Sequence, residues 1–187
     1  MQIVSVETET EVSSDLPLTA NLMEVGTTTA SNLQVDADGS ISNPKLGETA
    51  RTVAKFKLKN NTTNSEDITI SSITLKEDGT SDETSDMRNL ILKCGGTEIA
   101  KVSAMSSKYL TFEPKDGILV KEAKSTNCEI IADIVGGASK TISFIIERDI
   151  DIVAQGSKYK GINVSDYAAA TLADKNVSGG AGITIQA

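Results

Sequence analysis

The chain has 187 residues, no histidine, no tryptophan and a formal net charge of -8 at pH 7. Without histidine it lacks the commonest general base and metal ligand, and without tryptophan it lacks a usual platform for stacking on sugars. An acidic chain repels phosphate backbones and anionic lipid headgroups, so nucleic-acid and membrane-surface partners are disfavoured. No nucleophile elbow, phosphate-binding loop or dinucleotide-binding motif is present, and we expect neither an enzyme nor an organic cofactor.

The first predicted strand runs from Gln2 to Val12, where apolar and acidic side chains alternate. A polar stretch ending at Pro17 follows and can act as a hinge. Residues 1–15 are therefore predicted to be a strand donated to a neighbouring molecule, and residues 16–187 a single domain. The same strand closing its own sheet is the alternative that the pattern leaves open. The predicted subunit-contact residues on its two faces are Val4, Val6, Val12, Glu7, Glu9 and Glu11. The outward-facing row Lys55, Lys57 and Lys59 is the expected cross-strand complement of the three glutamates.

A short carboxylate motif follows at Asp36 and Asp38, which precede Gly39 and Ser40. Oxygen ligands at alternate positions around a glycine are typical of loops that bind calcium. Gly47 stands where an EF-hand loop would carry its last glutamate, so that motif is not met. A solvated acidic loop is the alternative interpretation.

Alternation with a period of two continues through the rest of the chain and predicts strands. Between Asp67 and Lys76 the alternation changes phase at Ser71 and Ser72, which predicts a β-bulge. Residue pairs that accept positive φ, such as Gly95-Gly96, separate several runs and indicate a meander of hairpins. The predicted strands are Arg51 to Lys59, Asp67 to Lys76, Asn89 to Cys94, Thr97 to Val102, Tyr109 to Glu113, Asn127 to Val135, Thr141 to Glu147, Asp149 to Ala154, Tyr159 to Val164 and Gly182 to Gln186.

Between Lys76 and Arg88 the sequence is polar and acidic, which predicts an exposed loop. Its carboxylates at Asp78, Asp82 and Asp86 form a second candidate calcium site, again with a solvated acidic loop as the alternative. Bound calcium is predicted to support assembly more than folding.

The two cysteines, Cys94 and Cys128, both fall on the apolar face of a predicted strand. We predict that both are buried and that, in a secreted protein, they form a disulfide. Two buried free thiols are the alternative. A zinc site is not expected, because two cysteines without histidine do not complete the usual tetrahedral set.

Ser165 to Lys175 is the one segment compatible with a short helix, and a loop fits it equally well. All other predicted elements are strands. The expected fold is therefore an all-β, mostly antiparallel β-sandwich of the jelly-roll or immunoglobulin-like type.

The middle of the chain combines a framework strand, an Asn-Asn turn and an Ala-Asp-Ile strand. These features lie in the run Phe56 to Asn61, the paired runs Ile68 to Ile70 and Ile73 to Lys76, Asp116 to Ile118, and Ala132 to Gly137. In these runs the chain resembles bacterial and archaeal cell-surface β-sandwich subunits, namely surface-layer, pilus-like and camelysin or TasA-like proteins. The resemblance implies an extracellular, non-catalytic subunit that in some families polymerises by donating a terminal strand.

The function predicted from these observations is a structural subunit of an extracellular filament or surface layer, with other copies of itself as partners. The alternative is a monomeric adhesive or carbohydrate-binding domain at the cell surface, whose partners would be surface glycans. The scarcity of aromatic residues, 3% of the chain, counts against a sugar-binding site. No stretch is long and apolar enough to predict a membrane span.

Overall fold

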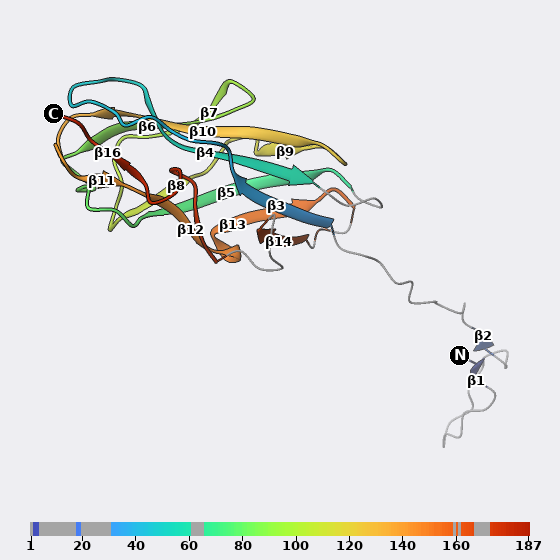
Figure 1. Cartoon of the computed structure of the whole chain (residues 1–187). Helices are drawn as coiled ribbons and strands as arrows, with labels where there is room; N and C mark the ends of the chain where they lie inside the picture. The colour runs from blue at the N-terminus through green and yellow to red at the C-terminus, as the bar shows by residue number, and fades with distance from the viewer. Residues whose placement is uncertain are drawn as a thin grey trace, which may run out of the picture.

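The computed structural model describes residues 2–3, 18–19, 31–60, 66–158, 160, 162–166 and 173–187 (Figure 1). These residues form β-strands joined by turns, and their one helical element is the 3₁₀ turn η1 (Asp149–Asp151). All strand pairings except two are antiparallel: β14 runs parallel to β3, and Lys45 and Gln186 form a single parallel bridge. The predicted all-β, mostly antiparallel class is confirmed.

One sheet has six strands in the spatial order β14-β3-β4-β10-β6-β7. Only β3-β4 and β6-β7 are neighbours both in the chain and in space, so the predicted simple meander of hairpins is wrong. The other neighbours in this sheet are strands far apart in the chain, and turn residues predict pairing only between consecutive strands. The strands are β14 (Ile162–Asp166), β3 (Ser31–Ala37), β4 (Arg51–Asn60), β10 (Ser125–Ile134), β6 (Met87–Cys94) and β7 (Thr97–Val102).

The second sheet is built around β5 (Ile68–Glu77). Ile73 of β5 pairs with both Ile152 and Phe112, so β13 and β8 lie on opposite sides of β5. β12 pairs with the end of β5, on the same side as β13, and β15 pairs with β12. β9 pairs with the beginning of β5, on the same side as β8. The flanking strands are β13 (Ile152–Gly156), β12 (Phe144–Arg148), β15 (Ala173–Asn176), β8 (Tyr109–Phe112) and β9 (Ile118–Val120).

Two small pairings complete the described strands. β11 (Thr141–Ile142) pairs with β16 (Ile183–Thr184) near the C-terminus. β1 (Gln2–Ile3) pairs with β2 (Leu18–Thr19).

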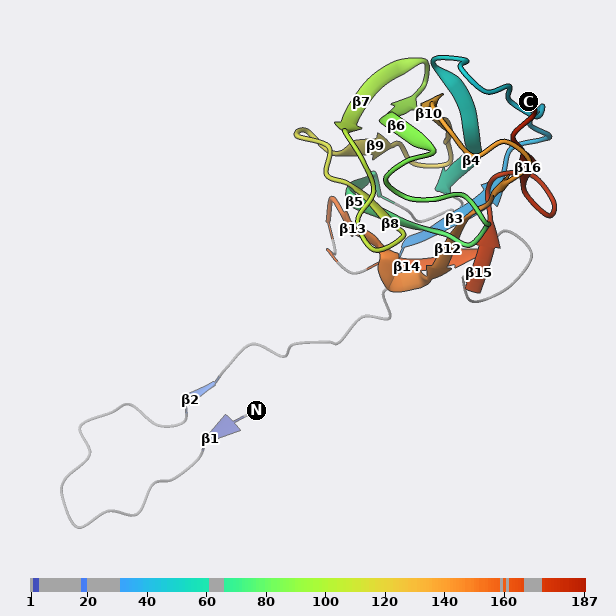
Figure 2. The same ribbon diagram turned by 90° about the vertical axis from the view of Figure 1, so that its left-hand side faces the viewer.

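The two large sheets face each other across one hydrophobic core, in a sandwich-like arrangement (Figure 2). The three phenylalanines of the chain, Phe56, Phe112 and Phe144, are completely buried and come from strands of both sheets. Fully burying such a side chain contributes about 1.5–3 kcal/mol. The alternation of the sequence therefore has a direct cause, because every second residue of these strands points into this core.

One side of the sandwich is closed by a short segment that hydrogen-bonds to both sheets. Ser178 Oγ accepts a hydrogen bond from the Phe144 amide of β12 over 2.8 Å and donates one to the Val53 carbonyl of β4 over 2.7 Å. The neighbouring Val177 donates its amide to the Phe144 carbonyl and accepts a hydrogen bond from the Lys55 amide. Both residues are buried, so the edges of the two sheets are sealed at this point.

The predicted bulge in β5 is present. Ser72 lies opposite Val153 and Ile70 opposite Ala154, which leaves Ser71 as the extra residue. Because the bulge shifts the phase by one residue, Ile68, Ile70, Ile73 and Leu75 all reach the core. The Gly95-Gly96 turn between β6 and β7 has φ angles of 59° and 82°, as a two-residue hairpin requires.

Other sequence predictions need correction. β3 was not predicted as a strand, because its outward residues Asn32, Gln34 and Asp36 give it a polar, loop-like composition. The predicted strand Asp149 to Ala154 begins as η1 and becomes β13 only at Ile152. The described ends of the helix-or-loop segment Ser165 to Lys175 are strand residues of β14 and β15, and residues 167–172 lie outside the described residues.

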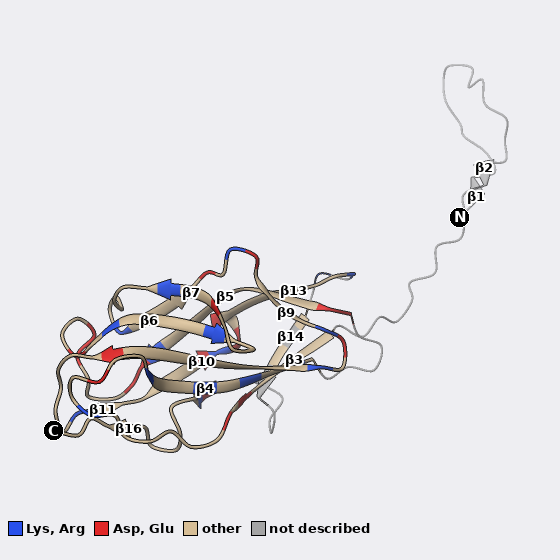
Figure 3. Ribbon diagram, turned by 90° about the horizontal axis from the view of Figure 1, so that it is seen from above, with Lys and Arg blue, Asp and Glu red and all other residues tan. Residues whose placement is uncertain are grey.

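Basic and acidic residues both occur along the strands of the six-stranded sheet (Figure 3). On β4, Lys55, Lys57 and Lys59 alternate with buried residues, as predicted. Lys55 lies opposite Glu129 of β10, and Lys57 lies opposite Asp36 of β3. Lys55 and Lys57 therefore already have acidic cross-strand neighbours within the chain, whereas Lys59 lies opposite Ser125 and Gln34.

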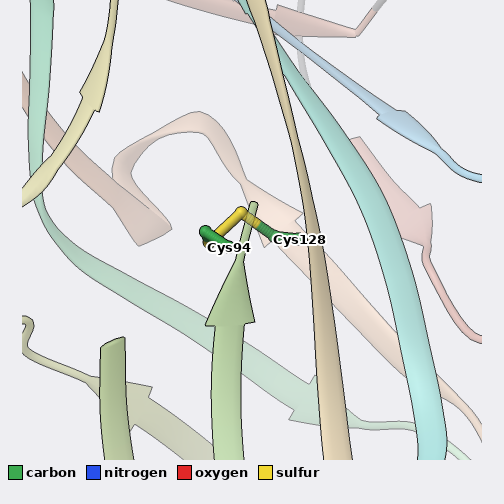
Figure 4. The surroundings of a disulfide bond; sticks show 2 residues. All are labelled: Cys94 and Cys128. Atoms are coloured by element: carbon green, nitrogen blue, oxygen red, sulfur yellow. A yellow bond between two sulfur atoms is a disulfide. The ribbon is translucent and has the colours of Figure 1, made fainter. Parts of the chain in front are cut away.

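Cys94 and Cys128 form a disulfide with an S–S distance of 2.03 Å (Figure 4). The two residues lie directly opposite each other on β6 and β10, so the bond joins neighbouring strands of one sheet. Both are buried, with 6% and 2% of their surface exposed.

Candidate functional site

The most distinctive surface of the described molecule is the edge formed by β13 and β14. β13 pairs with β5 on one side, and no described strand pairs with its other side. β14 is the terminal strand of the facing sheet. Both views show β13 beside β14 (Figures 1 and 2), so the outer strands of the two sheets meet here without a strand between them.

An open groove of about 460 Å³ lies between these strands. Among its described lining residues Asp149 is the one that carries a charge; the others are Ile150, Ile152, Val153, Ala154, Ile162 and Val164. Ile150 and Val153 are 71% and 53% exposed, the highest values among the described large hydrophobic residues. Exposed apolar side chains next to an unpaired strand edge are a typical surface for pairing with another segment.

Of the other described sheet edges, β7 and β9 are better protected against such pairing, whereas β8, with the four residues Tyr-Leu-Thr-Phe, is also uncharged. β7 carries the charged residues Glu98 and Lys101, and charge on an edge strand disfavours strand addition. β9 has only three residues, although its Leu119 is 51% exposed. β13 has neither protection, because its five residues, Ile-Val-Ala-Gln-Gly, include no charge.

This edge is not apparent from the sequence. The pattern from Asp149 to Ala154 predicts a strand and does not show that its outer side is open. Adjacent residues of a strand point to opposite faces, and here Ile152 is buried while Val153 is 53% exposed. Adjacent apolar residues also occur in the paired strand β4, at Val53 and Ala54, so they do not single out an edge strand.

The first predicted calcium motif is not gathered into a loop. Asp36 lies in β3, and its Oδ1 is 2.8 Å from Lys175 Nζ. Asp38 follows β3, and its Oδ1 is 3.9 Å from Lys57 Nζ. The structure thus places a lysine ammonium beside each carboxylate.

The carboxylates of the second predicted calcium site also contact protein donors. Asp82 Oδ1 accepts hydrogen bonds from Thr84 and Ser85, which hold the pKa of Asp82 well below its usual range. Asp86 Oδ2 accepts from the Asp82 amide and from Lys140 Nζ. The remaining predicted ligand, Asp78, donates its amide to the Ser143 carbonyl.

Among the described residues, no group of three or more histidine, cysteine or acidic residues is arranged to hold a metal ion. Calcium binding at Asp36 and Asp38 or at Asp78, Asp82 and Asp86 stays a prediction. Melting with and without a chelator tests it, and an unchanged melting temperature together with an unchanged polymer yield would contradict it.

The predicted subunit-contact residues Val4, Val6, Val12, Glu7, Glu9 and Glu11 lie outside the described residues. Of the predicted donor segment, Gln2 and Ile3 are described, and they pair with Thr19 and Leu18 of the same chain. The sequence also suggested that the glutamates would face Lys55, Lys57 and Lys59 as cross-strand partners. That is wrong, because β4 is paired with β3 on one side and with β10 on the other and has no free edge.

No family model, no curated protein and no solved structure matches this chain. No helix among the described residues is long and apolar enough to cross a membrane.

Proposed function

We propose that this chain is a structural subunit of an extracellular filament or surface layer, and that its subunits join by strand donation. The observation that carries the proposal is the uncharged, unpaired edge of β13 beside an apolar groove. A sheet edge of this kind binds an added strand through backbone hydrogen bonds and through pockets for alternate side chains. The segment from Gln2 to Val12 has the matching alternation of apolar residues.

The disulfide supports the extracellular part of the proposal. Cys94 and Cys128 are the only cysteines of the chain and are bonded to each other. Disulfides persist in oxidising compartments and are rare in the cytosol.

The energetics favour packing as the main source of affinity. Burying each of Val4, Val6 and Val12 contributes about 1.5–3 kcal/mol, whereas each opposed charge pair across strands contributes about 0.2–1 kcal/mol. Loss of the valines should therefore weaken assembly much more than loss of the glutamates.

The test compares two full-length triple variants by negative-stain microscopy and sedimentation. We expect Val4→Ser/Val6→Ser/Val12→Ser to abolish polymer formation and Glu7→Gln/Glu9→Gln/Glu11→Gln to retain it. A version lacking residues 2–12 should also fail to polymerise, and an added peptide of that sequence should occupy the vacated acceptor edges. If the valine variant polymerises normally, strand donation from this end is wrong; a wild-type protein that stays monomeric and binds glycans would instead support the adhesive alternative.

A further inference from the structure

We infer that the groove between β13 and β14 is the acceptor site, and that its occupant is the Gln2 to Val12 segment of a second copy of this chain. This inference rests on the proposed function and names the edge that the donated strand joins. Three observations carry it: the chemistry of the groove, the charges around it, and the position at which the N-terminal part of the chain leaves the sandwich.

The lining of the groove fits one face of the segment. Ile152 is 4% and Val164 is 8% exposed, so the floor of the groove is continuous with the core. Ile150 and Val153 extend this apolar surface outward. A strand along β13 would place alternate small apolar residues, which in the segment are Val4, Val6 and Val12, over this floor.

Charges of both signs lie around the groove. Asp149 precedes β13 and lines the groove, whereas Lys158 and Lys160 lie two and four residues after β13 and are exposed. A donated strand whose glutamates lie at the end of β13 away from Asp149 would bring them near these two ammonium groups. Exposed large hydrophobic residues also occur on β9 (Leu119) and β8 (Tyr109), and residues of opposite charge, Lys121 and Glu122, follow β9.

The chain outside the described body begins beside the groove. Ser31, the first residue of β3, pairs with Ile162, the first residue of β14. Residues 13–30 separate Ser31 from the segment and reach about 60 Å when extended, which is enough to reach a neighbouring molecule. Within one chain, Gln2 and Ile3 pair with β2 and not with β13. The acceptor edge therefore has no described partner of its own and is left for another copy.

Photo-crosslinking of the full-length protein tests the assignment. Val153→benzoylphenylalanine places the reactive group at the groove, and Leu119→benzoylphenylalanine places it at β9 as a control with nearly the same exposure, 53% against 51%. Each variant is prepared as an equal mixture of unlabelled and heavy-isotope-labelled chains, so that about half of the products between chains carry both labels and products within a chain never do. The crosslinked peptides are then identified by mass spectrometry.

We expect the Val153 variant to give a mixed-isotope product with residues 2–12 and the Leu119 variant to give none. If all products of Val153 with residues 2–12 carry a single isotope label and none is mixed, the segment closes its own chain, which overturns the inference and the proposed donation together. Filaments that form while Val153 captures no residue of 2–12, or while Leu119 captures that segment, overturn the groove assignment alone.

Discussion

Ser71 Oγ donates a hydrogen bond to the Val153 carbonyl oxygen over 3.1 Å, across the register shift that makes Ser71 the extra residue of β5. This contact joins the bulge to the edge strand β13. Bulges are frequent at sheet edges, where they change the direction of a strand. Here the Val153 carbonyl oxygen accepts a hydrogen bond from β5, while the Val153 side chain is 53% exposed beside the groove.

Replacing Val153 should therefore affect assembly without affecting folding. We expect Val153→Lys to reduce polymer yield strongly, because a lysine on an edge strand opposes strand addition. Val153→Thr keeps the β-branched shape and should polymerise nearly as well as the wild type. Sedimentation measures polymer yield, and thermal melting should show that both variants are within about 0.5 kcal/mol of wild-type stability, as is usual for surface changes. Equal polymer yields for the two variants would contradict a role for this edge.

Reduction of the Cys94–Cys128 disulfide should destabilise the folded chain substantially. The bond spans 34 residues, and closing a loop of this length in the unfolded state is worth about 4 kcal/mol. Urea denaturation with and without reductant measures the difference. The Cys94→Ala/Cys128→Ala variant is the control and should not respond to reductant, whereas identical midpoints for the oxidised and reduced wild type would refute the prediction.

Polymer yield should increase with ionic strength. The formal net charge is -8, so subunits repel one another as they approach. Salt shortens the screening length from about 30 Å at 0.01 M to about 8 Å at 0.15 M, which weakens this repulsion but leaves apolar packing intact. Sedimentation across this range measures the effect, with sucrose as an uncharged control. A yield that falls with added salt would mean that charge pairs hold the subunits together.

Glu77 should make stability depend on pH in a definite direction. Its side chain is buried, and Oε1 accepts hydrogen bonds from the amides of Gly79 and Ser143. Burial raises the pKa of Glu77 above 4.5, and these hydrogen bonds oppose the rise only in part. A raised pKa in the folded state means that the contribution of Glu77 to stability is full below about pH 4.5 and is lost as the pH rises through the folded value.

Comparison with Glu77→Gln isolates this contribution. The free energy of unfolding of the wild type minus that of the variant should decrease from about pH 4 to pH 7, since glutamine does not titrate. Glu113→Gln, which removes one carboxylate at an exposed position, serves as the control. Urea denaturation at each pH gives both differences, and a difference for Glu77→Gln that grows with pH would reverse the predicted sign.

The sequence by itself determined the strand class, the bulge at Ser71 and the inward direction of Cys94 and Cys128. These features are local, because alternation within one strand reports which face is buried regardless of the partner strand. Strand β3 is not apparent from its alternation, because its polar residues, including Asp36, and the Asp38-Gly39 pair that follows are typical of a turn.

Only the tertiary structure decided which strands pair and which edges remain open. Lys55, Lys57 and Lys59 seemed available to a donated strand, but β3 and β10 occupy both sides of β4. The sequence from Asp149 to Ala154 does not show an edge, but no described strand lies outside β13, and Val153 is 53% exposed there. Strand order depends on contacts between residues far apart in the chain, and one strand has the same periodicity whether it lies in the middle of a sheet or at its edge.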